Sequence, residues 1–183
     1  MFRPWVAVGA LGTGFLGVSA AALVCTVAPP AAPAASQVQA LLVLATKPGA
    51  HEEAVRLARE GRTDLLIVSD PNPGSDYLGT LCLDPPEDVT VVCFVPSPSR
   101  TVGEVDAAVD IARSHGASSL GILTFREHAF RARLLAATRW DGDVVTFLFE
   151  PDRNVAETMH DVVYAMAAYP KMIVEDMTRP GPG

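Results

Sequence analysis

Short apolar runs alternate along the chain with segments in which apolar residues recur at helical spacing. The runs are typical of strands covered on both faces and comprise Ala40–Ala45, Asp64–Ser69, Val89–Val95, Ser119–Thr124 and Val144–Phe149. The helical segments are His51–Glu60, Thr101–His115, Thr124–Arg139 and Asn154–Tyr169, the last of which is expected to end at Pro170. Because parallel neighbouring strands need crossover connections, this alternation predicts a three-layer, Rossmann-like α/β domain over residues 38–175, with a parallel sheet of about five strands.

A longer apolar run precedes this domain. Trp5 to Val27 contains 23 residues and no charge. At 1.5 Å per residue such a helix spans roughly 34 Å, which is enough for the hydrocarbon core of a bilayer. Arg3 lies before the run and the next basic residue is Lys47, so the positive-inside bias places the amino end in the cytoplasm and the domain outside.

The remaining segments at the two ends follow from this prediction. Residues 1–28 are expected to be a single-pass transmembrane signal anchor, residues 29–37 a Pro/Ala tether and residues 176–183 a disordered tail. The alternative is a signal peptide cleaved near Ala32-Pro33-Ala34, after which the domain would be secreted. Both alternatives place the domain outside the cytoplasm.

Composition narrows the classes of partner. The chain has 183 residues, enough for one domain, and carries a net charge of −7. An acidic chain lacks the basic face that phosphate neutralisation requires, so nucleic-acid binding is not expected. The four histidines are scattered without metal-ligand spacing, no nucleotide-binding glycine motif occurs, and neither a metal nor a cofactor is predicted.

The cysteines suit an oxidising compartment. Cys82 and Cys93 are 11 residues apart and are predicted to form a disulfide, with two buried free thiols as the alternative. Cys25 lies in the apolar run and is expected to be inert. The segment from Asp70 to Asp88 is long for a connection in a compact domain, and a bridge through Cys82 would pin it to the sheet.

Ligands of parallel α/β sheets collect at the carboxyl ends of the strands, where Lys47 and Ser69 are found. The most distinctive segment there is Thr124–Arg133, which contains three arginines and His128. His128 and Arg131 share a helix face near its first turns, where the macrodipole disfavours cations unless an anion is present. This mismatch indicates an anionic ligand, and a solvated basic face is the alternative.

Three helix starts carry a second, structural pattern. Thr101/Glu104 and Thr124/Glu127 have the spacing of capping boxes, and Asn154/Glu157 is a near variant. Spacing alone therefore predicts a capping role for all six residues. His115 precedes Gly116 and is expected to serve the end of its helix.

Two segments, Pro96–Val105 and Thr124–Arg133, resemble the signature segments of the YdcF/SanA/ElyC-like family, closest to its actinobacterial, secreted or anchored members. The family carries Ser/Thr-Thr-x-Gly-Glu-Ala after the third strand and His-x-x-Arg-Ala after the fourth. The resemblance covers about residues 38–150 and implies a Rossmann-like fold, a role in the bacterial cell envelope and functional roles for four positions, namely Thr101, Glu104, His128 and Arg131.

This chain departs from the family pattern at three places. The turns after the first and second strands, Ala45–Gly49 and Ser69–Pro71, have fewer glycines, and Val105 replaces a small alanine. Fewer glycines leave fewer places where backbone can approach a phosphate closely.

The sequence thus predicts a membrane-anchored extracytoplasmic domain that binds an anionic, phosphorylated or carboxylated envelope metabolite, either a small molecule or lipid-linked. The expected ligand-binding residues are Thr101, Thr124, Arg126, Arg131, Lys47 and Ser69. If the domain is an enzyme, His128 is its acid or base, Glu104 orients it or serves as the base, and the reaction is hydrolysis or transfer of the ligand. The alternatives are a non-catalytic binding or scaffold module and, as for one cytoplasmic family member, a binder of S-adenosylmethionine or a nucleotide.

Overall fold

The computed structural model describes residues 23–33, 35–44, 49–73 and 81–177, with side chains up to residue 171. The elements of the domain are β1 (Val38–Val43), α2 (Ala50–Arg59), β2 (Thr63–Ser69), β3 (Thr90–Phe94), α3 (Thr101–Ser114), β4 (Leu120–Phe125), α4 (Arg126–Ala137), β5 (Val144–Phe149) and α5 (Val155–Met177). Every predicted strand is present within two residues of its predicted bounds.

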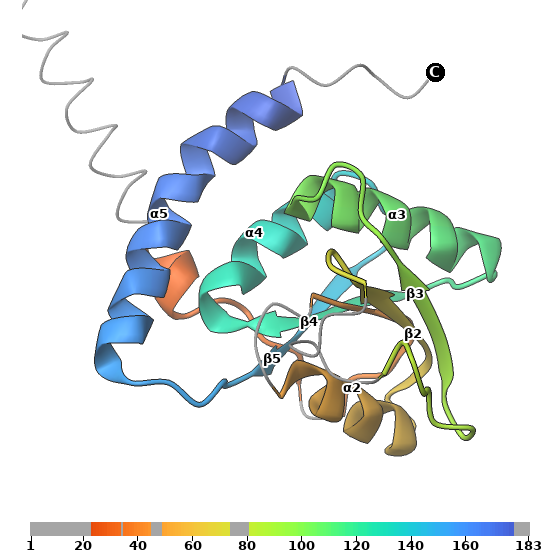
Figure 1. The fold of residues 1–183 in the computed structure, drawn as a ribbon. Helices are drawn as coiled ribbons and strands as arrows, with labels where there is room; N and C mark the ends of the chain where they lie inside the picture. The colour runs from red at the N-terminus through yellow and green to blue at the C-terminus, as the bar shows by residue number, and fades with distance from the viewer. Residues whose placement is uncertain (1–22, 34, 45–48, 74–80, 178–183) are drawn as a thin grey trace, which may run out of the picture.

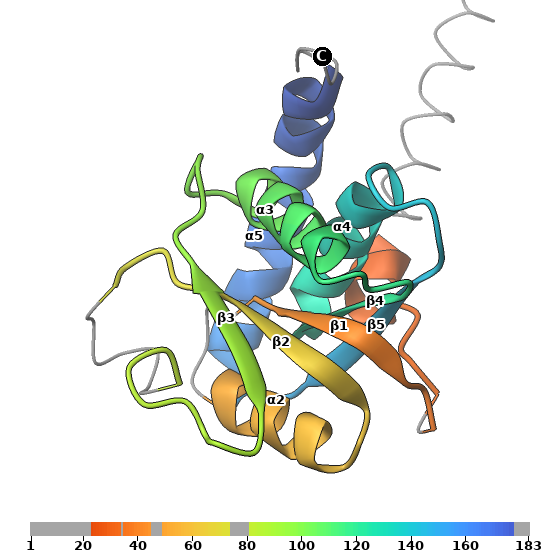
Figure 2. The ribbon, with the colours of Figure 1, turned by 90° about the vertical axis from the view of Figure 1, so that its right-hand side faces the viewer.

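The five strands form one parallel sheet in the order β3-β2-β1-β4-β5 (Figure 2). Helices α3 and α4 cover one face and α2 covers the other, while α5 lies beside α4 (Figure 1). This confirms the predicted α/β fold with a parallel sheet flanked by helices. The order reverses between β1 and β4, and such a switch point is where open α/β sheets place their ligands.

The central strands β1, β2 and β4 are largely apolar because both of their faces are buried, whereas no residue of the edge strand β3 is fully buried. Leu42, Ile67 and Ile122 pack under α3 and α4. The alternate residues Leu41, Leu66 and Leu123 point to the α2 side, and none of these six side chains is exposed. Because successive strand residues face opposite sides, a continuous apolar run serves two cores at once.

The last helix corrects one prediction. Pro170 does not end α5, which continues to Met177 with the proline inside it. A proline removes one backbone donor. Here its neighbour Tyr169 is buried in the core and contacts the Phe130 ring on α4, so tertiary packing holds the helix through the proline.

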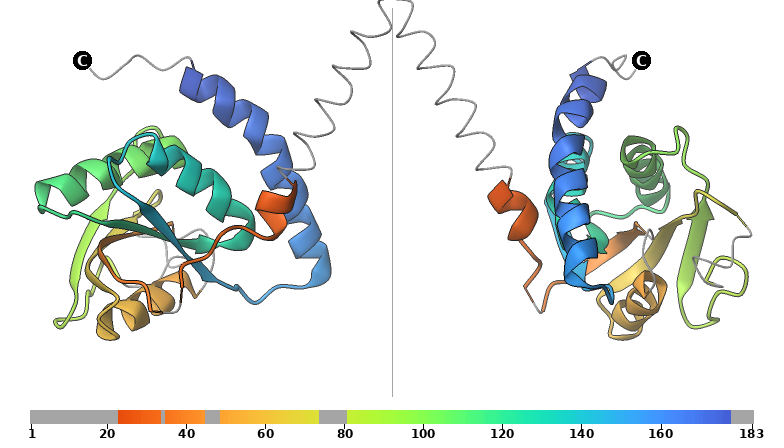
Figure 3. Two further views of the ribbon diagram at one scale, coloured as in Figure 1. Left: turned by 180° about the vertical axis from the view of Figure 1, so that it is seen from behind. Right: turned by 60° about the vertical axis from the view of Figure 1, so that its left-hand side comes forward.

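Described residues ahead of β1, including part of the predicted tether, contact the domain. Residues 23–27 form a helical turn beside α5 in both views of Figure 3. Thr26 is fully buried, with its Oγ1 3.1 Å from the hydroxyl of Tyr169. The Ala32 amide donates to the Thr146 carbonyl at 2.7 Å, and Arg62 donates to the carbonyl of Ser36. We call residues 23–33 the N-terminal strap.

The predicted membrane span cannot be followed further in the structure. Residues 1–22 lie outside the described residues, as do Lys47 and the end of the predicted tail from residue 178. Among the described helices, none has the length and hydropathy needed to cross a bilayer.

The predicted disulfide is confirmed. Cys82 and Cys93 are bonded with a Cα–Cα distance of 5.8 Å. The bond ties the segment that follows β2 to Cys93 in β3, as expected for a long connection held at the sheet edge. Cys25 is half-buried and takes no part in a disulfide.

Candidate functional site

A cleft of about 400 Å³ opens at the carboxyl ends of β2 and β4. The starts of α3 and α4 form its floor and α5 forms one wall. Its lining comprises Pro71, Ser99, Arg100, Thr101, Glu104, Phe125, Glu127, His128, Arg131, His160, Asp161, Tyr164 and Ala165. Thr101, Glu104, His128 and Arg131, which the sequence singles out, are thus brought together.

His128 lies between two threonine hydroxyls. Thr101 Oγ1 is 3.1 Å from Nε2 and Thr124 Oγ1 is 3.2 Å from Nδ1. Burial, reinforced by the charge of Arg131, lowers the pKa of His128 to about 3. The imidazole is therefore uncharged at neutral pH. It can accept a proton only as a weak base, or it can relay a hydrogen bond.

Glu104 does not cap its helix. Ser69 Oγ, at the end of β2, donates to Glu104 Oε1 at 2.8 Å, and both residues are buried. Burial raises the pKa of Glu104, opposed by the Ser69 hydrogen bond and the charge of Arg131. Ser69 is thereby used to hold Glu104 at the cleft, and a carboxyl with a raised pKa is a candidate proton donor or acceptor.

The glycine of the Thr-x-Gly-Glu segment has a packing role. A Cβ at Gly103 would lie 2.2 Å from the Pro98 carbonyl oxygen. Only glycine lets the first turn of α3 approach this loop so closely. The contact holds Ser99 and Arg100 at the rim of the cleft, where both line it.

Arg131 is a half-buried cation on the cleft wall. Burial lowers the pKa of Arg131, and electrostatic interactions with Tyr164, Tyr169 and Glu104 oppose this shift. Among the residues that the structure describes, none forms a hydrogen bond or an ion pair with its guanidinium. A desolvated guanidinium with unused donors is the strongest feature of the site.

Arg126, which the sequence predicts as a ligand-binding residue, does not line this cleft. Its guanidinium pairs with Glu150 at 2.5 Å and donates to the Val27 carbonyl of the N-terminal strap. Arg133 donates to the Val144 carbonyl at 3.1 Å. Of the three arginines in the segment, only Arg131 faces the cleft, so proximity in sequence does not produce a cluster in space.

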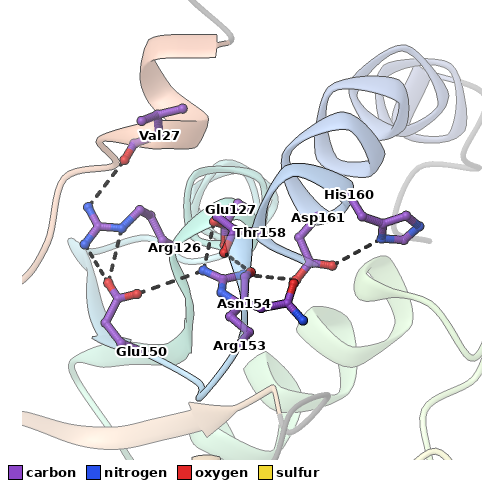
Figure 4. A network of polar contacts seen from close by, with 9 residues as sticks. All are labelled: Val27, Arg126, Glu127, Glu150, Arg153, Asn154, Thr158, His160 and Asp161. Atoms are coloured by element: carbon purple, nitrogen blue, oxygen red, sulfur yellow. Dashed lines mark hydrogen bonds and ion pairs between the residues drawn. The ribbon is translucent and has the colours of Figure 1, made fainter. Parts of the chain in front are cut away.

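A buried network of ion pairs, which the sequence analysis missed, supports the α5 side of the cleft (Figure 4). Arg153, 9% exposed, lies 2.9 Å from Glu127 and 3.0 Å from Asp161. The side chain of Glu127 is only 2% exposed, so its charge depends on this partner. The network joins the start of α4 to α5 and thereby positions both sides of the cleft.

The three predicted capping boxes have different outcomes in the structure. Only Asn154 and Glu157 form one, through reciprocal side-chain to backbone bonds of 2.9 and 3.0 Å. Helix α3 begins after Arg100 and α4 after Phe125, and neither has a side-chain cap. The first N–H groups of both helices therefore lack a side-chain acceptor. At the other end of α3, His115 is the C-cap and Gly116 has a φ of 71°, as predicted.

Within the described ranges no three His, Cys, Asp or Glu side chains converge as metal ligands. The acidic side chains at the cleft are engaged, Glu104 with Ser69 and both Glu127 and Asp161 with Arg153. The lining thus offers hydrogen-bond donors and aromatic faces.

Comparison of the chain with known protein families, curated proteins and solved structures finds no match.

Proposed function

We propose that this domain binds an anionic, phosphorylated or carboxylated cell-envelope metabolite in the cleft, and that it does so outside the cytoplasm, anchored by its N-terminal segment. The observation that carries the proposal is Arg131, a partly desolvated guanidinium on the cleft wall with no ion pair among the described residues. A guanidinium offers a planar fork of donors that matches a phosphate or carboxylate.

Two further features support an anion at this place. Helices α3 and α4 both start beside the cleft without side-chain caps, and helix N-termini favour negative charge. The four positions implied by the resemblance to the YdcF/SanA/ElyC-like family, Thr101, Glu104, His128 and Arg131, all line this one cleft. The resemblance itself remains a prediction.

The geometry also permits chemistry at the bound group. The Thr101 hydroxyl lies within hydrogen-bond distance of Nε2 of the neutral His128, and Thr124 orients the ring from Nδ1. In this order of groups, Nε2 would take the proton of the Thr101 hydroxyl as its oxygen attacks the phosphorus of a phosphate ester. The alcohol of the ester would leave with that proton, and water or an acceptor hydroxyl would then remove the phosphoryl group from Thr101. Arg131 would stabilise the developing charge.

A second candidate function is binding without catalysis. The pKa of His128 is about 3, which makes its ring a weak base. A weak base between two hydroxyls fits a hydrogen-bonded relay that fixes the cleft shape. Turnover by wild type that is lost in His128→Ala favours the enzyme, whereas retained binding with no turnover in either protein favours the binding module.

The N-terminal strap favours a retained anchor over a cleaved signal peptide. Thr26 is buried against Tyr169, and Ala32 both packs on the core and bonds to Thr146. Cleavage near Ala32 would remove contacts that the fold uses. The intact mass of protein extracted from membranes should therefore include the residues before Ala32, and a mass beginning after residue 34 would refute retention.

The binding proposal is tested by calorimetry on the full chain in detergent with a panel of sugar phosphates and dicarboxylates. At least one should bind, and Arg131→Ala should weaken it by about tenfold or more, since a charge-assisted hydrogen bond is lost. Arg126→Ala is the matched control because it removes the same charge outside the cleft. Equal affinities for the two variants, or no binding by wild type, would reject the proposal.

A further inference from the structure

A second hollow of about 180 Å³ adjoins the cleft on its α3 and α5 side. It shares several lining residues with the cleft, among them Arg100, Thr101 and Arg131, and adds Lys171 from α5. Arg131 therefore borders both spaces. A ligand held by its guanidinium in the cleft has an adjoining space into which a second group can extend.

The charge of this hollow differs from that of the chain. Its described lining contains three cationic side chains, Arg100, Arg131 and Lys171, and no carboxylate. The protein as a whole carries a net charge of −7. Arg100 and Lys171 also make other contacts, and each brings a positive charge to the border of the hollow. Three cations around a small space favour a group with more than one negative charge.

The cleft and the second hollow also differ in their apolar and aromatic lining residues. Phe125 and Ala165 border the cleft and are absent from the lining of the second hollow. A ligand that spans both spaces would place an organic part against the aromatic and apolar side chains of the cleft. Its charged end would lie between α3, Arg131 and Lys171.

We infer that the ligand is an organic diphosphate, with one phosphoryl group on Arg131 and the other in the second hollow between Arg100 and Lys171. This inference rests on the proposed function and specifies the substrate class of the same site. The start of α3 adds backbone N–H groups that can donate to a phosphoryl oxygen. No side-chain cap hydrogen bond at this helix start competes for them.

The test compares methylene diphosphonate, a diphosphate analogue that resists hydrolysis, with orthophosphate by calorimetry on the full chain in detergent at fixed ionic strength. Wild type should bind the diphosphonate about tenfold more tightly or better, because a second charged group finds partners of its own. Lys171→Gln should remove about threefold to tenfold of the diphosphonate affinity and leave orthophosphate within about twofold. Arg113→Gln, an exposed charge away from both spaces, should change neither.

Each other outcome overturns the inference in a recognisable way. Equal affinities for both anions, or equal weakening of both by Lys171→Gln, would mean that the second hollow is not a subsite, while the proposed function survives. Binding of neither anion together with binding of a dicarboxylate would reject the diphosphate alone. If no anion binds, the proposed function fails as well. If Lys171→Gln folds poorly, Arg100→Gln tests the same subsite.

Discussion

Arg131 on α4 and Arg153 just before α5 are both partly buried arginines, yet their surroundings differ in one respect. Arg153 has carboxylates on two sides, Glu127 and Asp161. Burial, which lowers the pKa of Arg153, is outweighed by these partners, and its pKa is raised. For Arg131 burial prevails and the pKa is lowered. A buried guanidinium thus becomes a structural cross-link where carboxylates form ion pairs with it. It becomes a candidate ligand site where, as for Arg131 among the described residues, the nearby carboxylate of Glu104 acts on it without forming an ion pair.

The largest expected effect follows from removing the paired arginine. Arg153→Met would leave the buried carboxylate of Glu127 without its ion-pair partner and would remove one partner of Asp161, and this should lower the free energy of unfolding by about 3–5 kcal/mol. Urea unfolding followed by circular dichroism measures it. Arg126→Met is the matched control, because its exposed pair with Glu150 should be worth no more than about 1 kcal/mol. Similar losses in both variants would show that burial of the network does not matter.

The same contrast explains which predictions from sequence succeeded. The strands and their order along the chain were predictable because short apolar runs are local features, which in β1, β2 and β4 reflect burial on both faces. The Asn154/Glu157 capping box was predictable for a similar reason, since both residues are exposed and no other partner competes for them.

The failures involve partners that are distant in sequence. Glu104 and Glu127 have capping spacing, but Ser69 and Arg153 bind them instead, from 35 and 26 residues away. A sequence pattern of a few residues cannot show that Ser69 and Arg153 compete with the helix starts for these two carboxylates. Arg126 and Arg131 are both arginines of the same segment, and only the fold shows that Glu150 forms an ion pair with Arg126.

A change in stability of intermediate size is expected for the pH dependence of His128, whose pKa the charge of Arg131 helps to lower. The pKa of His128 is about 3 in the folded protein, below its ordinary value of 6.5, so the unfolded chain binds the proton more readily. The stability from this group is complete above pH 6.5 and is lost as pH falls towards 3. Between pH 6.5 and 4.5, wild type should lose about 2 kcal/mol more than His128→Gln, whose side chain does not titrate. Urea unfolding at several pH values measures the difference, and parallel curves would contradict the burial of an uncharged ring.

The smallest expected change in stability is that of Arg131→Met. The variant keeps an apolar stem and leaves no ion-pair partner behind among the described residues, so the free energy of unfolding should change by less than about 1 kcal/mol. The pKa of His128, followed by NMR of the ring, should rise because the charge that helps to lower it is gone. A loss as large as that of Arg153→Met would make Arg131 a structural residue like its neighbour, and the case for a ligand at its guanidinium would then fall. A small loss with a raised His128 pKa would leave an arginine that is costly to bury and contributes little to folding, which is the condition expected of a residue kept for binding.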